Sequence, residues 1–289
     1  MIKVIKDYKS IPSALTKKGC HRKVKRAVTT LDGNIYDGYY YKDLTVTAQL
    51  GSIYNHKCGY CESFSNHVAT LQVEHFRPKA KVTEDSSHKG YYWLGCEWSN
   101  LLLACSKCNG KGAKGNFFPI LGNRVLHDTP FNHLGEFNRI TSLANSSFLA
   151  NEQPLLLNPE LDAPEQCLTF RYLGSLEGLN LKGRKSISTY KLNRNDLFLR
   201  RQDVVNKYVG QLKRILAKAK RGDYENNGYK NTLRELFEEI EYTNIKTQEY
   251  ILWRWHIFNN FSDCILSRIS AAYRRHVGKA FILYKQGKL

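Results

Sequence analysis

Two cysteine pairs with the same spacing constrain the fold of this chain more than any other feature. Residues 58–61 read Cys-Gly-Tyr-Cys, and residues 105–108 read Cys-Ser-Lys-Cys. Two such pairs supply the four thiolates of a tetrahedral zinc site, each pair forming a tight turn around the metal. The alternative, four unrelated buried thiols, does not account for the repeated spacing. The predicted ligands of a structural zinc ion are Cys58, Cys61, Cys105 and Cys108.

The other four of the eight cysteines are scattered and are interpreted as small buried apolar residues. The first residues lack the apolar core of a signal peptide, and no apolar run is long enough to span a bilayer. We therefore expect a soluble cytoplasmic protein whose thiols are reduced, which favours metal binding over disulfides.

The segment between the cysteine pairs predicts two strands and a helix. Residues 71–73 alternate apolar and polar side chains like a short strand, and Pro78 requires the chain to leave that strand just after His75. Residues 98–104 form a second aromatic and apolar segment that ends at the second cysteine pair. Asn109 is then expected near the start of a helix. The predicted order is strand, loop, strand and helix, clasped by zinc.

Polar residues in and after these strands are suited to cutting a phosphodiester. Glu74 and Asn109 offer a carboxylate and a carbonyl oxygen, which are ligands that Mg²⁺ prefers. A bound cation polarises the scissile phosphate and stabilises the leaving oxygen. His75, neutral near pH 7, takes the proton of an attacking water, and the carboxamide of Asn100 orients its ring. Singly these residues indicate little, so the prediction depends on their order between the metal ligands.

The chain is strongly basic, with 44 basic and 26 acidic residues and a formal net charge of +18. Such a charge favours nucleic acid or an anionic membrane surface as a partner. A basic run at residues 17–26 fits a solvated face and a phosphate-binding stripe equally well. The cations near the predicted catalytic residues that we expect to contact phosphate are Arg77, Lys79, Lys111 and Lys114.

The rest of the chain is predicted to be mainly helical. Residues 42–56 are ambiguous, because they alternate like a strand but have the length of a helix. From Asp196 onward apolar residues recur at helical spacing, and residues 251–272 predict one long terminal helix. These apolar stripes indicate core packing, although Trp253 and Trp255 are also candidates for a partner contact.

Three stretches resemble the HNH endonucleases of the ββα-metal class. They are Val-Glu-His-Phe-Arg-Pro-Lys at residues 73–79, Trp-Ser-Asn-Leu at 98–101 and Cys-Ser-Lys-Cys-Asn at 105–109. More narrowly, residues 114–119 and Pro-Leu-Leu-Leu-Asn-Pro at 154–159 are similar to the PtuB-like effectors of Septu and retron anti-phage defence systems. The HNH likeness covers about residues 58–119.

The resemblance implies an α+β protein in which a zinc-clasped ββα-metal (HNH) finger is embedded in mainly helical structure. Its segments would be residues 1–57, a basic N-terminal segment; 58–120, the finger; and 121–289, a helical region able to dock a partner. Glu74 and Asn109 would bind a catalytic Mg²⁺ or Mn²⁺ ion. Many HNH enzymes carry aspartate where Glu74 stands, and residues 110–113 are unusually rich in glycine for a helix start.

The resemblance also implies partners and a place in defence. PtuB-like proteins act with PtuA, an ATPase of the ABC/SMC type, which implies a hetero-oligomer here. In retron systems the assembly also includes a reverse transcriptase and its DNA–RNA product. The region from Tyr229 onward is the expected docking surface, and the ATPase would gate access to the substrate.

Functions of three classes fit the sequence. The favoured one is a metal-dependent endonuclease that hydrolyses DNA or RNA, including tRNA, in an anti-phage complex. The second is a zinc-stabilised nucleic-acid-binding protein without catalysis, which has no use for Glu74, His75 and Asn100 together. The third is a protein whose helical part docks on an ATPase while the finger is vestigial.

Overall fold

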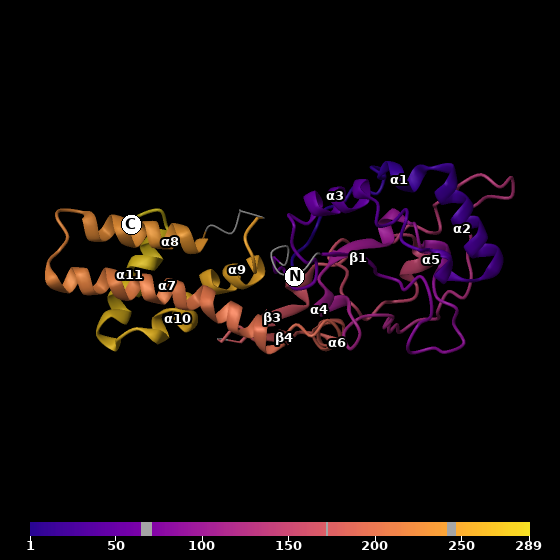
Figure 1. Ribbon diagram of the computed structural model, residues 1–289. Helices are drawn as coiled ribbons and strands as arrows, with labels where there is room; N and C mark the ends of the chain where they lie inside the picture. Colours follow the sequence, from indigo (N-terminus) through magenta and orange to yellow (C-terminus); the bar gives the residue numbers. More distant parts are fainter. Residues whose placement is uncertain (65–70, 172, 242–246) are drawn as a thin grey trace. The chain divides into compact units, whose positions relative to one another are not determined.

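The computed structural model describes residues 1–64, 71–171, 173–241 and 247–289 (Figure 1). The chain divides into two compact units. Unit 1 comprises Met1–Leu168 and Gly178–Leu192, and unit 2 comprises Thr169–Glu177 and Asn193–Leu289. Residues 1–57 and 58–120 thus share unit 1 with the first part of the region expected to be a separate helical segment.

Unit 1 combines short helices with a two-stranded sheet. Its helices are α1 (Ser13–Thr16), α2 (Lys18–Thr30), α3 (Leu44–Ile53), α4 (Ser106–Asn109), α5 (Ser147–Ala150) and α6 (Leu181–Thr189). The 3₁₀ turns are η1 (Gly33–Ile35), η2 (Tyr92–Leu94), η3 (Trp98–Asn100) and η4 (Pro164–Gln166). The ambiguous segment is the helix α3, which Asp43 caps by accepting a hydrogen bond of 2.8 Å from the backbone N–H of Thr45.

The sheet of unit 1 consists of β1 (Gln72–His75) and β2 (Leu101–Ala104), which pair antiparallel. The first strand lies where the sequence predicts it, whereas only the second half of the predicted segment 98–104 is a strand, because Trp98–Asn100 forms the turn η3. In the register Glu74 lies opposite Leu102, and His75 lies opposite Leu101. All of β2 is buried, and α3 packs against it. The buried strand β2 therefore supports the end of β1, where Glu74 and His75 lie.

The helix after the second cysteine pair is shorter and earlier than expected. It was predicted to begin near Asn109, but α4 ends at that residue. The glycines that follow are the reason: Gly112 and Gly115 have positive φ angles of 86° and 43°, which a right-handed helix does not contain. Residues 110–116 consequently form a loop.

The core of unit 1 is aromatic and surrounds the segment between β1 and β2. Trp93 and Trp98 are almost completely buried. The rings of Phe76 and Phe118 meet edge to face with their centroids 5.3 Å apart, and Tyr91 contacts Phe118 in the same manner at 5.5 Å. This packing fixes the chain on both sides of the predicted catalytic residues.

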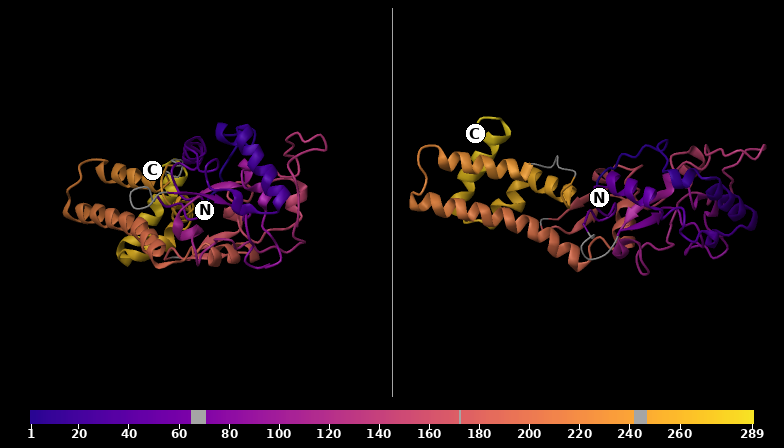
Figure 2. Two further views of the ribbon diagram at one scale, coloured as in Figure 1. Left: turned by 45° about the vertical axis from the view of Figure 1, so that its right-hand side comes forward. Right: turned by 45° about the horizontal axis from the view of Figure 1, so that its top comes forward.

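Unit 2 is built from helices. They are α7 (Asn195–Arg221), α8 (Gly228–Glu241), α9 (Ile251–Asn259), α10 (Phe261–Cys264) and α11 (Ala271–Lys285), with a 3₁₀ turn η5 (Leu266–Arg268). The two long helices α7 and α8 run side by side in both views of Figure 2. The chain crosses between the units inside the paired strands β3 (Leu168–Phe170) and β4 (Leu176–Gly178), and again before Asn193.

The prediction of one long helix over residues 251–272 is wrong. The backbone leaves the helical region at Asn260, with φ −115° and ψ 42°, and becomes extended at Ile269, with φ −110° and ψ 165°. The apolar residues still pack in the core, because the breaks in the helix allow the rings of Phe261 and Phe281 to stack with their centroids 4.0 Å apart. Among the helices that the structure describes, none combines the length and apolar character needed to cross a membrane.

Candidate functional site

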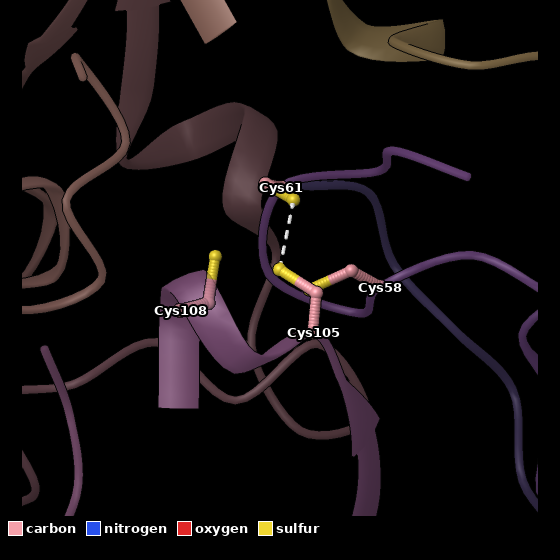
Figure 3. A group of neighbouring side chains, drawn as sticks. All are labelled: Cys58, Cys61, Cys105 and Cys108. Atoms are coloured by element: carbon pink, nitrogen blue, oxygen red, sulfur yellow. Dashed lines mark hydrogen bonds between the residues drawn. The ribbon is translucent and has the colours of Figure 1, made fainter. Parts of the chain in front are cut away.

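The four predicted zinc ligands lie together (Figure 3). Their sulfur atoms are all within 4.8 Å of one another, and the sulfurs of Cys61 and Cys105 are 3.8 Å apart. A tetrahedral site with Zn–S bonds of about 2.3 Å places its sulfurs about 3.8 Å apart. All four side chains are buried, so this cluster has the donors and the spacing to hold a metal such as zinc.

Local geometry attaches the first cysteine pair to the sheet. The backbone N–H of Gly59 donates to the carbonyl of Leu103 in β2 over 2.8 Å. A Cβ atom at position 59 would lie 2.5 Å from the ring of Tyr54, so only glycine fits there. Burial raises the pKa of the Cys58 thiol well above its usual range, so a cation is needed to keep this sulfur as a thiolate.

Three of the four predicted catalytic residues line one open cavity of about 710 Å³ in unit 1, which we call the catalytic pocket. Glu74 and His75 enter it from the end of β1, and Asn109 enters from the end of α4. The carboxamide of Asn109 lies beside the Glu74 carboxyl and acts to lower its pKa. Lys42 and Lys79 add positive charge to its lining.

His75 is held in one tautomer by a backbone group. Its Nε2 lies 2.9 Å from the carbonyl oxygen of Gly95, which can only accept, so Nε2 carries the proton and Nδ1 is the basic atom. The ring also meets Tyr41 edge to face at 4.7 Å. Burial, together with the smaller effects of Lys79, Lys114 and Lys42, lowers the pKa of His75 to about 3 against the opposing effect of the Gly95 hydrogen bond. The imidazole is therefore neutral at pH 7.

Asn100 is positioned differently from the expectation that it holds the histidine ring. Its Oδ1 accepts from the backbone N–H of Arg77 over 2.8 Å, and its Nδ2 donates to the carbonyls of Arg77 and Leu94 over 3.0 and 3.3 Å. The side chain thus ties the start and the end of the loop between the strands. The Gly95 carbonyl, which leaves no side-chain signature in a sequence, takes the ring-holding role.

Glu74 has a cation of the chain beside it. The Nζ atom of Lys114 lies 2.5 Å from its Oε1 and also donates to the backbone carbonyl of His75 over 3.0 Å. Burial raises the pKa of Glu74, and the charge of Lys114 acts in the opposite direction. The carboxylate and the carboxamide of Asn109 form a hard oxygen donor pair of the kind that Mg²⁺ or Mn²⁺ prefers. A divalent ion at this place would compete with the lysine.

The residues predicted to contact phosphate occupy different environments. Arg77 is 1% exposed, and its Nε donates to the Glu152 carboxylate over 2.8 Å, so its charge is used inside the protein. Lys114 is equally buried against Glu74. Lys79 is half-buried and donates to the carbonyl of Gly33 over 3.0 Å, whereas Lys111 is exposed on the glycine-rich loop.

Comparison with known proteins finds two similar proteins that carry the name Septu protein PtuB. It is 38% identical to the Septu protein PtuB of Bacillus mycoides (strain KBAB4) over 163 residues, which are 54% of this chain and 50% of that protein. It is 39% identical to the Septu protein PtuB of Bacillus thuringiensis over 89 residues, which are 29% of this chain and 30% of that protein.

The chain is also similar to a second Septu component. It is 26% identical to the Septu protein PtuA of Bacillus mycoides over 212 residues, which are 71% of this chain and 26% of that protein. No protein-family model and no solved structure matches the chain. It spans half or less of the length of each of these curated relatives. Over about half of its own length, the chain is a homologue of the Septu protein PtuB.

Proposed function

We propose that the protein is a metal-dependent HNH-type endonuclease that hydrolyses phosphodiester bonds of nucleic acid. The observation that carries the proposal is the convergence of Glu74, His75 and Asn109 on one open, positively charged cavity. The four-cysteine cluster supports it, because the cluster anchors the ends of the segment that presents these residues.

The chemistry follows from the state of each side chain. A Mg²⁺ or Mn²⁺ ion bound by Glu74 and Asn109 would supply Lewis-acid activation of the phosphate and stabilisation of the leaving oxygen. His75, neutral and with Nε2 committed to Gly95, takes the proton of the attacking water at Nδ1. The charge of Lys79 on the pocket wall favours the approach of a phosphate.

One contact favours the second candidate, a nucleic-acid-binding protein without catalysis. Lys114 neutralises Glu74 at 2.5 Å, so the carboxylate already has the counter-ion that burial requires. A pocket of this kind can bind phosphate through Lys42 and Lys79 without any divalent ion. The two candidates differ in whether His75 is needed for hydrolysis.

We further propose that the nuclease works in anti-phage defence with a PtuA-like ATPase. The similarity to Septu proteins supports this role. In unit 2, Trp253 is completely buried and donates its indole N–H to the carbonyl of Arg201 over 2.8 Å, so it belongs to the core. Trp255 is 51% exposed and is the better candidate for contact with a partner.

The test is a cleavage assay on labelled duplex DNA and on total tRNA, with and without a PtuA-like ATPase. The wild-type protein should cut one of these substrates in Mg²⁺ or Mn²⁺. Substitution His75→Ala should slow cleavage about 100- to 10,000-fold, the usual contribution of a general base. Cleavage by the variant at the wild-type rate would contradict the assignment of the base, and binding without cleavage under all conditions would favour the second candidate.

A further inference from the structure

A second cavity, of about 810 Å³, adjoins the catalytic pocket within unit 1. One side is the glycine-rich loop over residues 111–117, and the other is the C-terminal end of α6 with the residues just after it. Gly115 and Asn116 line both cavities, so the two share a wall. We call this second hollow the α6 cavity.

The α6 cavity is built to attract anions. Lys111, Lys185 and Lys191 line it and are exposed, and none of its described lining residues is acidic. Within the described part of the chain, the ammonium groups of Lys111 and Lys185 make no ion pair. The hydroxyl group of Thr189 adds a neutral hydrogen-bond donor, whereas that of Ser188 donates to the backbone carbonyl of Lys185 over 2.9 Å.

The loop wall allows a ligand to come close to the backbone. Gly112 has a φ angle of 86°, and a Cβ atom there would have no neighbour within 4 Å. The glycine is thus required by the backbone conformation, and the space in front of it is open. Lysines and the Thr189 hydroxyl beside an open glycine loop suit a phosphate group, which accepts hydrogen bonds from both kinds of donor.

We infer that the α6 cavity is a second phosphate-binding subsite, which takes a backbone phosphate of the nucleic acid whose scissile phosphate lies in the catalytic pocket. This inference rests on the proposed function for the placement of the scissile group. Because the cavity offers cations and the Thr189 hydroxyl, it binds the backbone without reading base sequence. Lys185 and Lys191 act as positioning residues, since they hold the strand beside the reacting atoms and do not touch them.

The test is a binding measurement that does not require hydrolysis. The double substitution Lys185→Ala/Lys191→Ala is made in the full chain carrying His75→Ala. Fluorescence anisotropy then follows the binding of a labelled DNA duplex and of labelled tRNA over a series of salt concentrations without divalent ions. The matched control is Lys9→Ala/Lys89→Ala, which removes the same charge from exposed lysines of unit 1 that line neither cavity.

The α6 variant is expected to bind more weakly than the parent. The slope of log K against log salt should also be shallower by about 1.4 to 1.8, which corresponds to two lost phosphate contacts. The control should keep the wild-type slope. An unchanged slope in the α6 variant, with thermal melting that confirms its fold, would overturn the inference, as would an equal loss in the control. The inference would also be overturned if the α6 variant bound nucleic acid as the parent does while ATP or inorganic phosphate still bound to the α6 cavity. A protein that binds in this manner but never cuts would refute only the proposed hydrolysis.

Discussion

Replacement of Arg77 by methionine is expected to destabilise unit 1 strongly. The guanidinium is buried, and its Nε and Nη2 donate to the Glu152 carboxylate over 2.8 Å and to the Leu149 carbonyl over 2.7 Å. Glu152 is completely buried and also accepts from Tyr91 over 2.6 Å and from the N–H of Val125 over 2.9 Å. Methionine preserves much of the volume but leaves the carboxylate as an unpaired buried charge.

The magnitude follows from the burial of both partners. Removal of one partner of a buried ion pair costs about 3–5 kcal/mol. For a unit of this size, 1 kcal/mol corresponds to about 2–4 °C in Tm, so the unfolding of unit 1 should move down by about 6–20 °C. The double variant Arg77→Met/Glu152→Gln should recover part of this loss, because the glutamine oxygen can still accept from Tyr91 and Val125.

The assay is calorimetry of the full chain together with native-state hydrogen exchange of the β2 amides, which reports unit 1 separately from unit 2. Nucleic-acid affinity should be unchanged below the melting temperature, since Arg77 is not available to phosphate. A Tm shift under about 2 °C combined with weaker nucleic-acid binding would refute the reasoning and would restore Arg77 as a phosphate contact.

Other features give further expectations. The pKa of His75 is about 3, below the ordinary value, so the imidazole is still neutral at about pH 6; the cleavage rate should therefore show no loss titrating near pH 6.5, and such a loss would contradict the buried environment. Purified protein should contain about one zinc ion per chain, and Cys58→Ser should lower both zinc content and Tm; full stability after complete zinc removal would exclude a structural site. Lys114→Met should tighten Mn²⁺ binding measured by calorimetry, whereas Glu74→Gln should weaken it; equal affinities in all three proteins would place the ion elsewhere. Trp255→Glu should abolish co-purification with the PtuA-like ATPase without lowering Tm, and an intact complex would exclude this surface.

Features determined by short stretches of sequence were predictable. The spacing of the cysteine pairs indicated the four-cysteine cluster, and the alternation before Glu74 indicated β1. The helical stripes of α7 and α8 were equally clear, because each long helix buries one apolar face. In these cases the residues that determine the structure are neighbours in the sequence or lie one helical turn apart.

Features that depend on distant partners were not predictable. The partner of Arg77 is Glu152, 75 positions away, so the sequence around the arginine does not distinguish it from an exposed cation. Lys114 pairs with Glu74 from the far side of the second cysteine pair. His75 is oriented by the carbonyl of Gly95, and every residue has such a group. Motif reading therefore found the residues of the pocket but not their charge partners.

The ion pair between Lys114 and Glu74 bears on the conditions under which the pocket can bind a divalent ion. A protein that buries a carboxylate normally needs a cation beside it in order to fold, and here Lys114 of the same chain is that cation. Folding of the pocket would then be independent of divalent ions, and the protein could accumulate intact but idle. Because an incoming ion would compete with this ammonium group, the proposed activity would depend on the concentration of free Mg²⁺ or Mn²⁺. A lysine in this place would make the cellular supply of free divalent ions part of the control of the proposed nuclease.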